Sequence, residues 1–185
     1  LLAVGIPGTV HGLLKIQKDY GKLPREQILE PAIRLAKDGF QINHSFARSL
    51  SGKKTKEHLT RFTSTRNIFY PNDKAIQFGD TLKQPDLAET LQRIQRDGVD
   101  GFYQGKTANL IVSYMQQNGG LITHQDLANY RSEYTTPFTF SYKNHELITH
   151  PLPSSGGITL YQILNLIEGM RLSSMGYNSP AYIHT

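Results

Sequence analysis

The chain has 185 residues, with 20 lysines and arginines against 15 aspartates and glutamates, a net charge of +5. Hydrophobic residues make up 38% of it, which is enough for one packed core. The sequence has no run of about 18 apolar residues, so no membrane-spanning helix is predicted. The absence of cysteine excludes disulfides, thiolate nucleophiles and thiolate metal sites. The length fits one domain or one and a half.

The positive charge is concentrated in residues 48–66. Six residues of this stretch are basic and one is acidic, so the excess of five equals the net charge of the whole chain. The basic residues are Arg48, Lys53, Lys54, Lys56, Arg61 and Arg66, and the acidic one is Glu57. A solvated surface, or one facing an acidic part of a larger protein, explains the pattern. Anion or partner binding is an alternative, whereas nucleic-acid binding is disfavoured because no such motif accompanies the charge.

The first 50 residues are predicted to be mostly helical. Thr9 is expected to cap a helix that Gly21 ends. A second helix is expected over 24–39, and Pro31 in its interior should kink or split it. A shorter helix follows near 44–50.

The middle of the chain changes from irregular to helical. Residues 51–84 are rich in polar residues and are predicted to be the least regular part. Helical periodicity returns over 85–97 and over 105–118. Thr123 and Asp126 have capping-box spacing at the start of another helix.

An alternating pattern follows the helices. Residues 138–142 and 146–149 alternate with period two and predict a β-hairpin. A strongly apolar helix is then expected over 158–167, buried on two sides.

These patterns predict an α+β fold that is predominantly helical. Residues 1–132 would form a mainly helical lobe with an irregular basic segment at 48–84, and residues 133–185 a strand pair plus a core helix. The chain ends one turn into a helix that Ser179 caps. Because a first turn alone is unstable, we expect the chain to be a fragment of one larger domain.

A polar turn between the second strand and the apolar helix is the strongest candidate site. Ser154, Ser155, Gly156 and Gly157 lie where a nucleophile elbow or an anion-binding helix N-terminus would lie. The turn is neither G-x-S-x-G nor a phosphate loop ending in Lys-Ser/Thr. A helix cap with close packing is favoured, and a ligand-facing loop is the alternative. His150 is the one histidine beside the turn, and a structural role is favoured for it.

No metal, cofactor or catalytic residue is predicted within the chain. The seven histidines show neither H-x-H nor H-E-x-x-H spacing. Asp97, Asp100, Asp126 and Glu133 form no spaced carboxylate pair, and Asp97-Gly98 and Asp100-Gly101 are typical of turns.

Four segments of the chain form a recognisable series: Gly8–Gly12, then Leu29–Phe40, then Leu87–Leu91 through Phe102–Gly105 with Gly119–Thr123 and Asp126–Tyr130, and finally Pro153–Gly157 with Gln162–Asn165. Taken in this order, they resemble the middle of the large subunit of the γ-glutamyltranspeptidase family. Leu152 departs from the pattern, because the family usually has a third proline there.

The resemblance implies an N-terminal-nucleophile hydrolase with a four-layer αββα sandwich. Residues 8–130 would form its helical lobe, 134–150 would add strands to the sheet, and 158–168 would pack on it. Such enzymes are made as one chain that cleaves itself. The small subunit is the expected partner, and its N-terminal Thr is the nucleophile.

The implied activity is transfer or hydrolysis of the γ-glutamyl group of glutathione and related compounds, through an acyl-enzyme and an oxyanion hole. The nucleophile would follow Thr185, and the arginine that holds the substrate would precede Leu1. The chain is therefore expected to be inactive alone. The resemblance also implies that the parent protein is periplasmic or secreted. Acylases of β-lactam side chains and poly-γ-glutamate depolymerases are alternatives within the fold.

Overall fold

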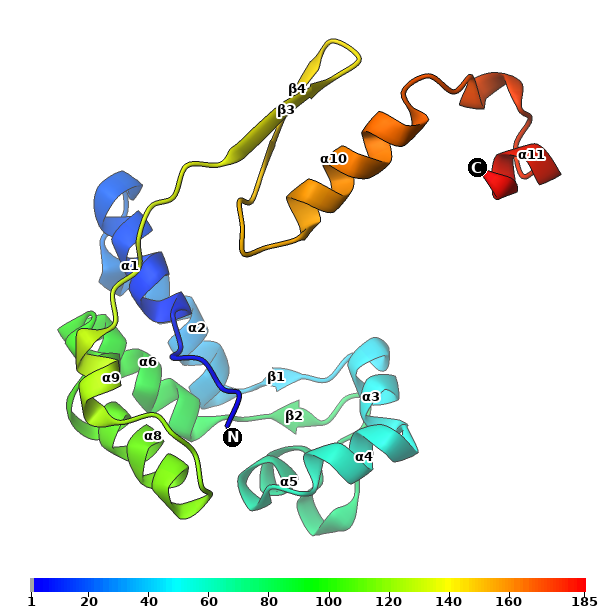
Figure 1. Ribbon diagram of the computed structural model, residues 1–185. Helices are drawn as coiled ribbons and strands as arrows, with labels where there is room; N and C mark the ends of the chain where they lie inside the picture. Colours follow the sequence, from blue (N-terminus) through cyan, green and yellow to red (C-terminus); the bar gives the residue numbers. More distant parts are fainter. Residues whose placement is uncertain (1) are drawn as a thin grey trace. The chain divides into compact units, whose positions relative to one another are not determined.

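The computed structural model describes residues 2–185, which form two compact units that meet between Ser132 and Glu133 (Figure 1). Helices account for most of the ordered elements, and the strands pair into two small antiparallel sheets. The predicted fold class, α+β and predominantly helical, is confirmed.

The first unit contains nine α-helices, one 3-10 helix and two short strands among its described residues. In chain order they are α1 (Thr9–Tyr20), α2 (Arg25–Asp38), β1 (Phe40–Gln41), α3 (His44–Ser51), α4 (Lys53–Leu59), α5 (Thr63–Phe69), η1 (Pro71–Asp73), β2 (Thr81–Leu82), α6 (Pro85–Asp97), α7 (Asp100–Tyr103), α8 (Gly105–Gln117) and α9 (His124–Asn129).

Helices α2 and α6 pack along one another and hold two distant parts of the first unit together (Figure 1). The guanidinium of Arg25 donates to the carbonyls of Gln95 at 2.8 Å and Arg96 at 3.2 Å, near the C-terminus of α6. These are carbonyls that a helix end leaves without an intrahelical partner. Arg25 therefore closes one helix end while it fixes the start of the other.

A hydrophobic core cluster of the first unit lies between α7, α8 and α9. Apolar residues on one face of α8 meet the side of α9. The buried members are Tyr103, Ala108, Val112, Met115, Ile122 and Leu127. The predicted capping box is confirmed, because Thr123 and Asp126 satisfy each other's backbone N–H groups at the start of α9.

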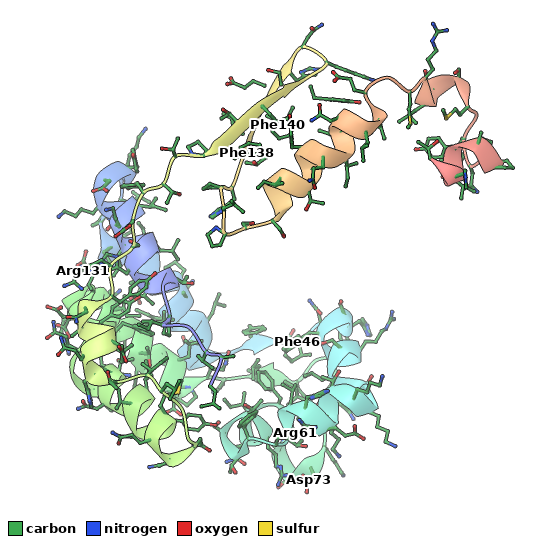
Figure 2. The ribbon with its side chains drawn as sticks, in the orientation of Figure 1. Phe46, Arg61, Asp73, Arg131, Phe138 and Phe140 are labelled. Atoms are coloured by element: carbon green, nitrogen blue, oxygen red, sulfur yellow. The ribbon has the colours of Figure 1, made fainter. Side chains whose placement is uncertain are left out.

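The second unit is a hairpin followed by a long helix and a short tail. Its elements are β3 (Phe138–Tyr142), β4 (His145–Thr149), α10 (Gly156–Ile167), η2 (Leu172–Ser174) and α11 (Pro180–His184). The hairpin is confirmed, with Phe138 opposite Thr149 and Tyr142 opposite His145. Tyr161 of α10 meets Phe138 and Phe140 edge-on at centroid distances of 5.8 and 5.1 Å. Figure 2 shows the two phenylalanines on the hairpin.

Three local predictions for the first unit are wrong. Thr9 is the first helical residue and Gly8 is the N-cap, with no side-chain cap. The predicted split of the second helix at Pro31 does not occur: α2 runs unbroken from Arg25 to Asp38, and the buried Ile33 and Ala36 hold the part that follows the proline. The segment 51–84, predicted to be irregular, contains α4, α5 and the 3-10 helix η1.

The short helices of segment 51–84 were missed because their burial depends on distant contacts. Buried Tyr70, just after α5, donates its hydroxyl to the carbonyl of Leu50 in α3 at 2.7 Å. Phe46 and Phe69 meet edge-on at 6.2 Å between ring centroids. Few apolar residues repeat within each helix, so the sequence shows little helical periodicity there.

Two further predictions fail at α7 and α10. Asp100-Gly101 begins the short helix α7, where a turn was predicted, and only Asp97-Gly98 ends a helix as expected. Of the residues of α10, only Gly157 is buried, so the predicted two-sided burial is absent from the described unit. A hairpin of two five-residue strands has too little surface to cover two sides of a twelve-residue helix.

Candidate functional site

The candidate turn of residues 154–157 leads directly into α10. The backbone N–H of Ser154 donates to the carbonyl of Pro151 at 3.1 Å. Ser155 is the N-cap, with φ −77° and ψ −16°, and its side chain makes no cap hydrogen bond. The expected serine cap is therefore wrong in its detail: Ser155 occupies the cap position, but its hydroxyl is not used there.

Gly157 explains how α10 approaches the hairpin. A Cβ atom at this position would lie only 2.8 Å from the carbonyl oxygen of His150 and would also collide with Thr149. A Cβ at Gly156 would meet nothing closer than the hydroxyl of Ser154 at 3.8 Å. The close approach predicted for the glycines is therefore confirmed at Gly157, which has a packing role.

The rest of the turn faces solvent within the second unit. Ser154, Ser155 and Gly156 are exposed, and neither serine hydroxyl has a hydrogen-bond partner among residues 2–185. The first backbone N–H groups of a helix also have no intrahelical acceptor. The turn thus combines two exposed serines with a helix N-terminus, and their O–H and N–H donors are suited to an anionic or carbonyl oxygen.

His150 has one ring nitrogen engaged beside this turn. Its Nδ1 lies 3.0 Å from the carbonyl oxygen of Pro151. Since a carbonyl only accepts, Nδ1 carries the proton in this contact. The neutral ring therefore has its lone pair on Nε2.

A second polar cluster, centred on His11, was not singled out from the sequence. Both the hydroxyl and the backbone N–H of Ser132 donate to Nδ1 of His11, at 2.7 and 3.1 Å. The hydroxyl of Tyr103 donates to the carbonyl of Pro7 at 2.5 Å and accepts the N–H of His11 at 3.2 Å. No sequence motif indicates this cluster, because its two halves are more than 90 residues apart.

The electrostatics of the His11 cluster favour neutral groups. Burial lowers the pKa of His11, and the charges of Arg131 and Lys15 lower it further. Burial raises the pKa of Tyr103. Because Nδ1 of His11 accepts two hydrogen bonds, its neutral ring carries the proton on Nε2. The cluster fastens the end of the first unit to α1, a structural role.

The predicted basic stretch 48–66 lies on α3, α4 and α5. Lys56 donates to the carbonyl of Asp73 at 2.8 Å, and the guanidinium of Arg66 lies 3.9 Å from the Asp73 carboxylate. Figure 2 shows Asp73 and Arg61 in this part of the first unit. Most of its charge is solvated.

The carboxylates and histidines of the described residues do not form a metal site. Across residues 2–185, no group of three histidine, aspartate or glutamate side chains is placed to hold a metal ion. Asp97 binds its neighbour Arg96 at 2.7 Å, and Asp126 is used in the capping box, so the pKa values of both carboxyls are lowered by hydrogen bonds. Within the same residues, no helix has the length and apolar character needed to cross a bilayer.

Comparisons with known proteins give a consistent result over the entire sequence. Residues 1–185 match the family Gamma-glutamyltranspeptidase. The glutathione hydrolase proenzyme of Escherichia coli is 39% identical over 96% of this chain and 30% of its own length. The acylase ACY 1 proenzyme of Pseudomonas sp. strain SE83 is 36% identical over 98% of this chain and 32% of its own length.

A solved structure has a closely similar backbone fold. The crystal structure of Helicobacter pylori gamma-glutamyltranspeptidase has a TM-score of 0.91 and 41% sequence identity, covering 99% of this chain and 52% of that one. Of the two proenzymes named above, the chain spans about a third of the length.

Proposed function

The chain belongs to the γ-glutamyltranspeptidase family, and we propose on that premise that the protein containing it transfers or hydrolyses the γ-glutamyl group of glutathione and related compounds. The observation that carries the proposal is the match over all 185 residues, with 41% identity and a TM-score of 0.91 to the Helicobacter pylori enzyme. The relatives named glutathione hydrolase support the same substrate class.

The proposed reaction is acyl transfer in two steps. The N-terminal Thr of a small subunit attacks the γ-carbonyl carbon, its proton passes to the leaving amine, and an ester forms as the amine departs. Water or an amino acid then attacks the ester and regenerates the Thr hydroxyl. In this proposal the Thr, the substrate-holding arginine and the oxyanion hole lie outside the 185 residues of this chain.

Two further features follow from the same premise. The small subunit, cut from the same precursor, is the proposed partner, in keeping with the proenzyme names of the relatives. A periplasmic or secreted location is proposed as well. No cofactor enters the proposed chemistry.

In this chain, the exposed turn is the proposed contribution to the substrate site. Ser154 and Ser155 present free hydroxyls beside the N-terminus of α10, so they are candidates for contacting the γ-glutamyl group. Gly156 would allow close approach, because the space around it is open, whereas Gly157 holds the helix against the hairpin.

The direct test is to express the whole precursor. We expect it to split into two chains, with this sequence in the larger one, and to release the anilide from γ-glutamyl-p-nitroanilide. Turnover should change when a dipeptide acceptor is added, while the 185-residue chain alone should give none. An intact, inactive precursor would contradict the proposal.

Changes in the turn would test the substrate contact within the active precursor. Ser154→Ala and Ser155→Ala should each raise KM by about threefold to tenfold, the equivalent of losing one hydrogen bond. Ser173→Ala removes an exposed hydroxyl elsewhere and should leave KM unchanged. Equal effects on KM at all three positions would show that the turn does not contact the substrate.

A second candidate keeps the mechanism and changes the acyl group. The 36% identity to a relative named acylase supports hydrolysis of another acyl group. We propose a β-lactam side chain as that group, and poly-γ-glutamate cleavage is a further variant. Comparing turnover of a glutaryl β-lactam, a γ-glutamyl anilide and a γ-linked glutamate polymer would separate the three. A stand-alone anion-binding role for 48–66 predicts binding without turnover of any of them.

A further inference from the structure

The net positive charge of the chain lies in one small region of the first unit, residues 44–78. This region holds seven basic residues of the chain's 20 and two acidic residues of its 15. The rest of the chain therefore has 20 − 7 = 13 basic and 15 − 2 = 13 acidic residues and is balanced. Such a concentration of one sign attracts ligands of the other sign.

A groove lies within this region, between α3 and residues 74–78. Small and apolar side chains line much of it; of its cationic groups, Arg48 belongs to α3 and Lys74 to residues 74–78. His44 and Phe78 are stacked at one part of the lining, with ring centroids 3.7 Å apart and an interplanar angle of 6°.

The nearby carboxylates are not part of the groove. Asp73 faces Arg66 at 3.9 Å, and Asp80 accepts the backbone N–H of Gln77 at 2.7 Å. Neither lines the groove, and neither does Glu57 of α4. Within residues 2–185, the side chains of Arg48 and Lys74 have no ion pair or hydrogen bond, so both cations are open to a ligand.

We infer that this groove binds a glutamate-rich acidic peptide segment. A glutamyl side chain carries two methylene groups that fit an apolar surface and a carboxylate that fits a cation at its edge. Ala47, Ala75 and Ile76 supply the surface, and Arg48 and Lys74 receive successive carboxylates. Lys53 and Lys54 at the start of α4 add to the local positive field.

A nucleic acid fits the groove less well. Binding of single strands needs aromatic faces on which several bases stack in turn. The aromatic rings of the lining are only His44 and Phe78, and each already covers a face of the other. A glutamate peptide needs no such platform.

Fluorescence anisotropy with a labelled glutamate octapeptide would test the inference on the 185-residue chain and on the whole protein. We expect binding to both, with a Kd that weakens several-fold as salt rises from about 0.05 M to about 0.2 M. The double variant Arg48→Ala/Lys74→Ala should weaken binding about tenfold, the loss of two exposed charge contacts. Arg48→Lys/Lys74→Arg keeps both charges and should stay within about threefold of the parent.

The matched control is Lys22→Ala/Arg171→Ala, which removes the same two residue types far from the groove in sequence. Equal weakening by the control and by the groove variant would overturn the inference, because general charge would then explain the binding. A single-stranded oligonucleotide of equal charge that binds as tightly as the peptide would overturn it too. So would a whole protein that fails to bind, since the groove would then be covered.

The peptide's linkage separates this binding from catalysis. An α-linked octapeptide offers no γ-glutamyl bond to cleave, so its binding does not depend on the proposed activity. If it binds through Arg48 and Lys74 while the γ-glutamyl anilide is not turned over, the groove stands and the proposed function fails. If the anilide is turned over while the octapeptide does not bind, the proposed function stands and the inference about the groove fails.

Discussion

The two units of the chain bury their apolar residues in different ways. Among residues 2–185, all fourteen buried hydrophobic residues belong to the first unit, from Ile33 to Leu127. In the second unit only Gly157 is buried among the described residues, although α10 is the most apolar of the long helices. Leu160, Ile163 and Leu166 of α10 remain exposed.

The difference separates a region that forms its own core from one whose apolar surface needs another layer. Several helices of the first unit are amphipathic and cover one another's apolar faces, as α2 and α6 do, although α1 buries none of its residues. Helix α10 has apolar residues around most of its circumference and a single hairpin against it. Large exposed apolar patches of this kind mark surfaces that pack against other protein. This agrees with a chain that covers about a third of its relatives' length.

The sharpest test of this contrast replaces one leucine in each unit. Leu127→Ala, at a position 0% exposed, should lower the free energy of unfolding of the first unit by about 2–5 kcal/mol. Leu166→Ala, at a position 74% exposed, should change the stability of the isolated chain by less than about 0.5 kcal/mol. Urea denaturation followed by circular dichroism measures both. Similar losses at the two positions would contradict the division.

A glycine pair tests the one tight contact of the second unit. Gly157→Ala should push α10 away from the end of β4 and destabilise their contact by about 1–3 kcal/mol, because the added Cβ meets Thr149 and His150. Gly156→Ala, with open space, is the matched control and should be neutral or stabilising. Hydrogen exchange of the hairpin amides reports the contact; equal protection in the two variants would show that it is not tight.

A buried hydroxyl tests the link between α3 and the end of α5. Tyr70 is 1% exposed and donates to the carbonyl of Leu50, so Tyr70→Phe leaves that carbonyl unpaired and should cost about 1 kcal/mol. Tyr177→Phe, at a position 97% exposed, is the control with the same chemical change. A chemical denaturation midpoint that shifts equally in both variants would count against the link.

The smallest expected effect is the pH dependence contributed by His11. Its pKa in the folded chain lies below the ordinary value of 6.5, so as the pH falls the unfolded chain is protonated at a higher pH than the folded chain. The contribution to stability is therefore complete above pH 6.5 and is lost as the pH falls through the lower folded pKa. Protonation also removes the lone pair that accepts both bonds from Ser132.

Unfolding measured between about pH 5 and about pH 7.5 should show this slope in the parent chain and a weaker one in His11→Ala. His58→Ala, in the exposed α4, is the control and should keep the parent's slope. An unchanged slope in His11→Ala would remove the proposed coupling between His11 and Ser132.

Much of the fold was predictable because its signals are local. Gly21, Gly39 and Gly98 end helices as expected, and Thr123 caps α9. The hairpin follows from alternating residues, with the turn at Lys143 and Asn144, both at positive φ. Helices α4 and α5 were missed because a few long-range contacts, such as the one from Tyr70, hold them.

The candidate site, too, was predictable from the sequence only in part. The position of residues 154–157 between a strand and a helix was predictable from the change of period. The packing role of Gly157 and the free hydroxyl of Ser155 became clear only when the end of β4 was placed against α10. The His11 contact with Ser132 had no local signal at all.

By itself, the sequence determined several helix ends, the hairpin, the capping box and the family resemblance, because each depends on residues close together or on motifs in order. The tertiary structure alone decided which apolar faces are covered, which cations border a groove and which glycine contacts the hairpin. Those properties depend on the distance between side chains far apart in the chain, and such distances are set by packing.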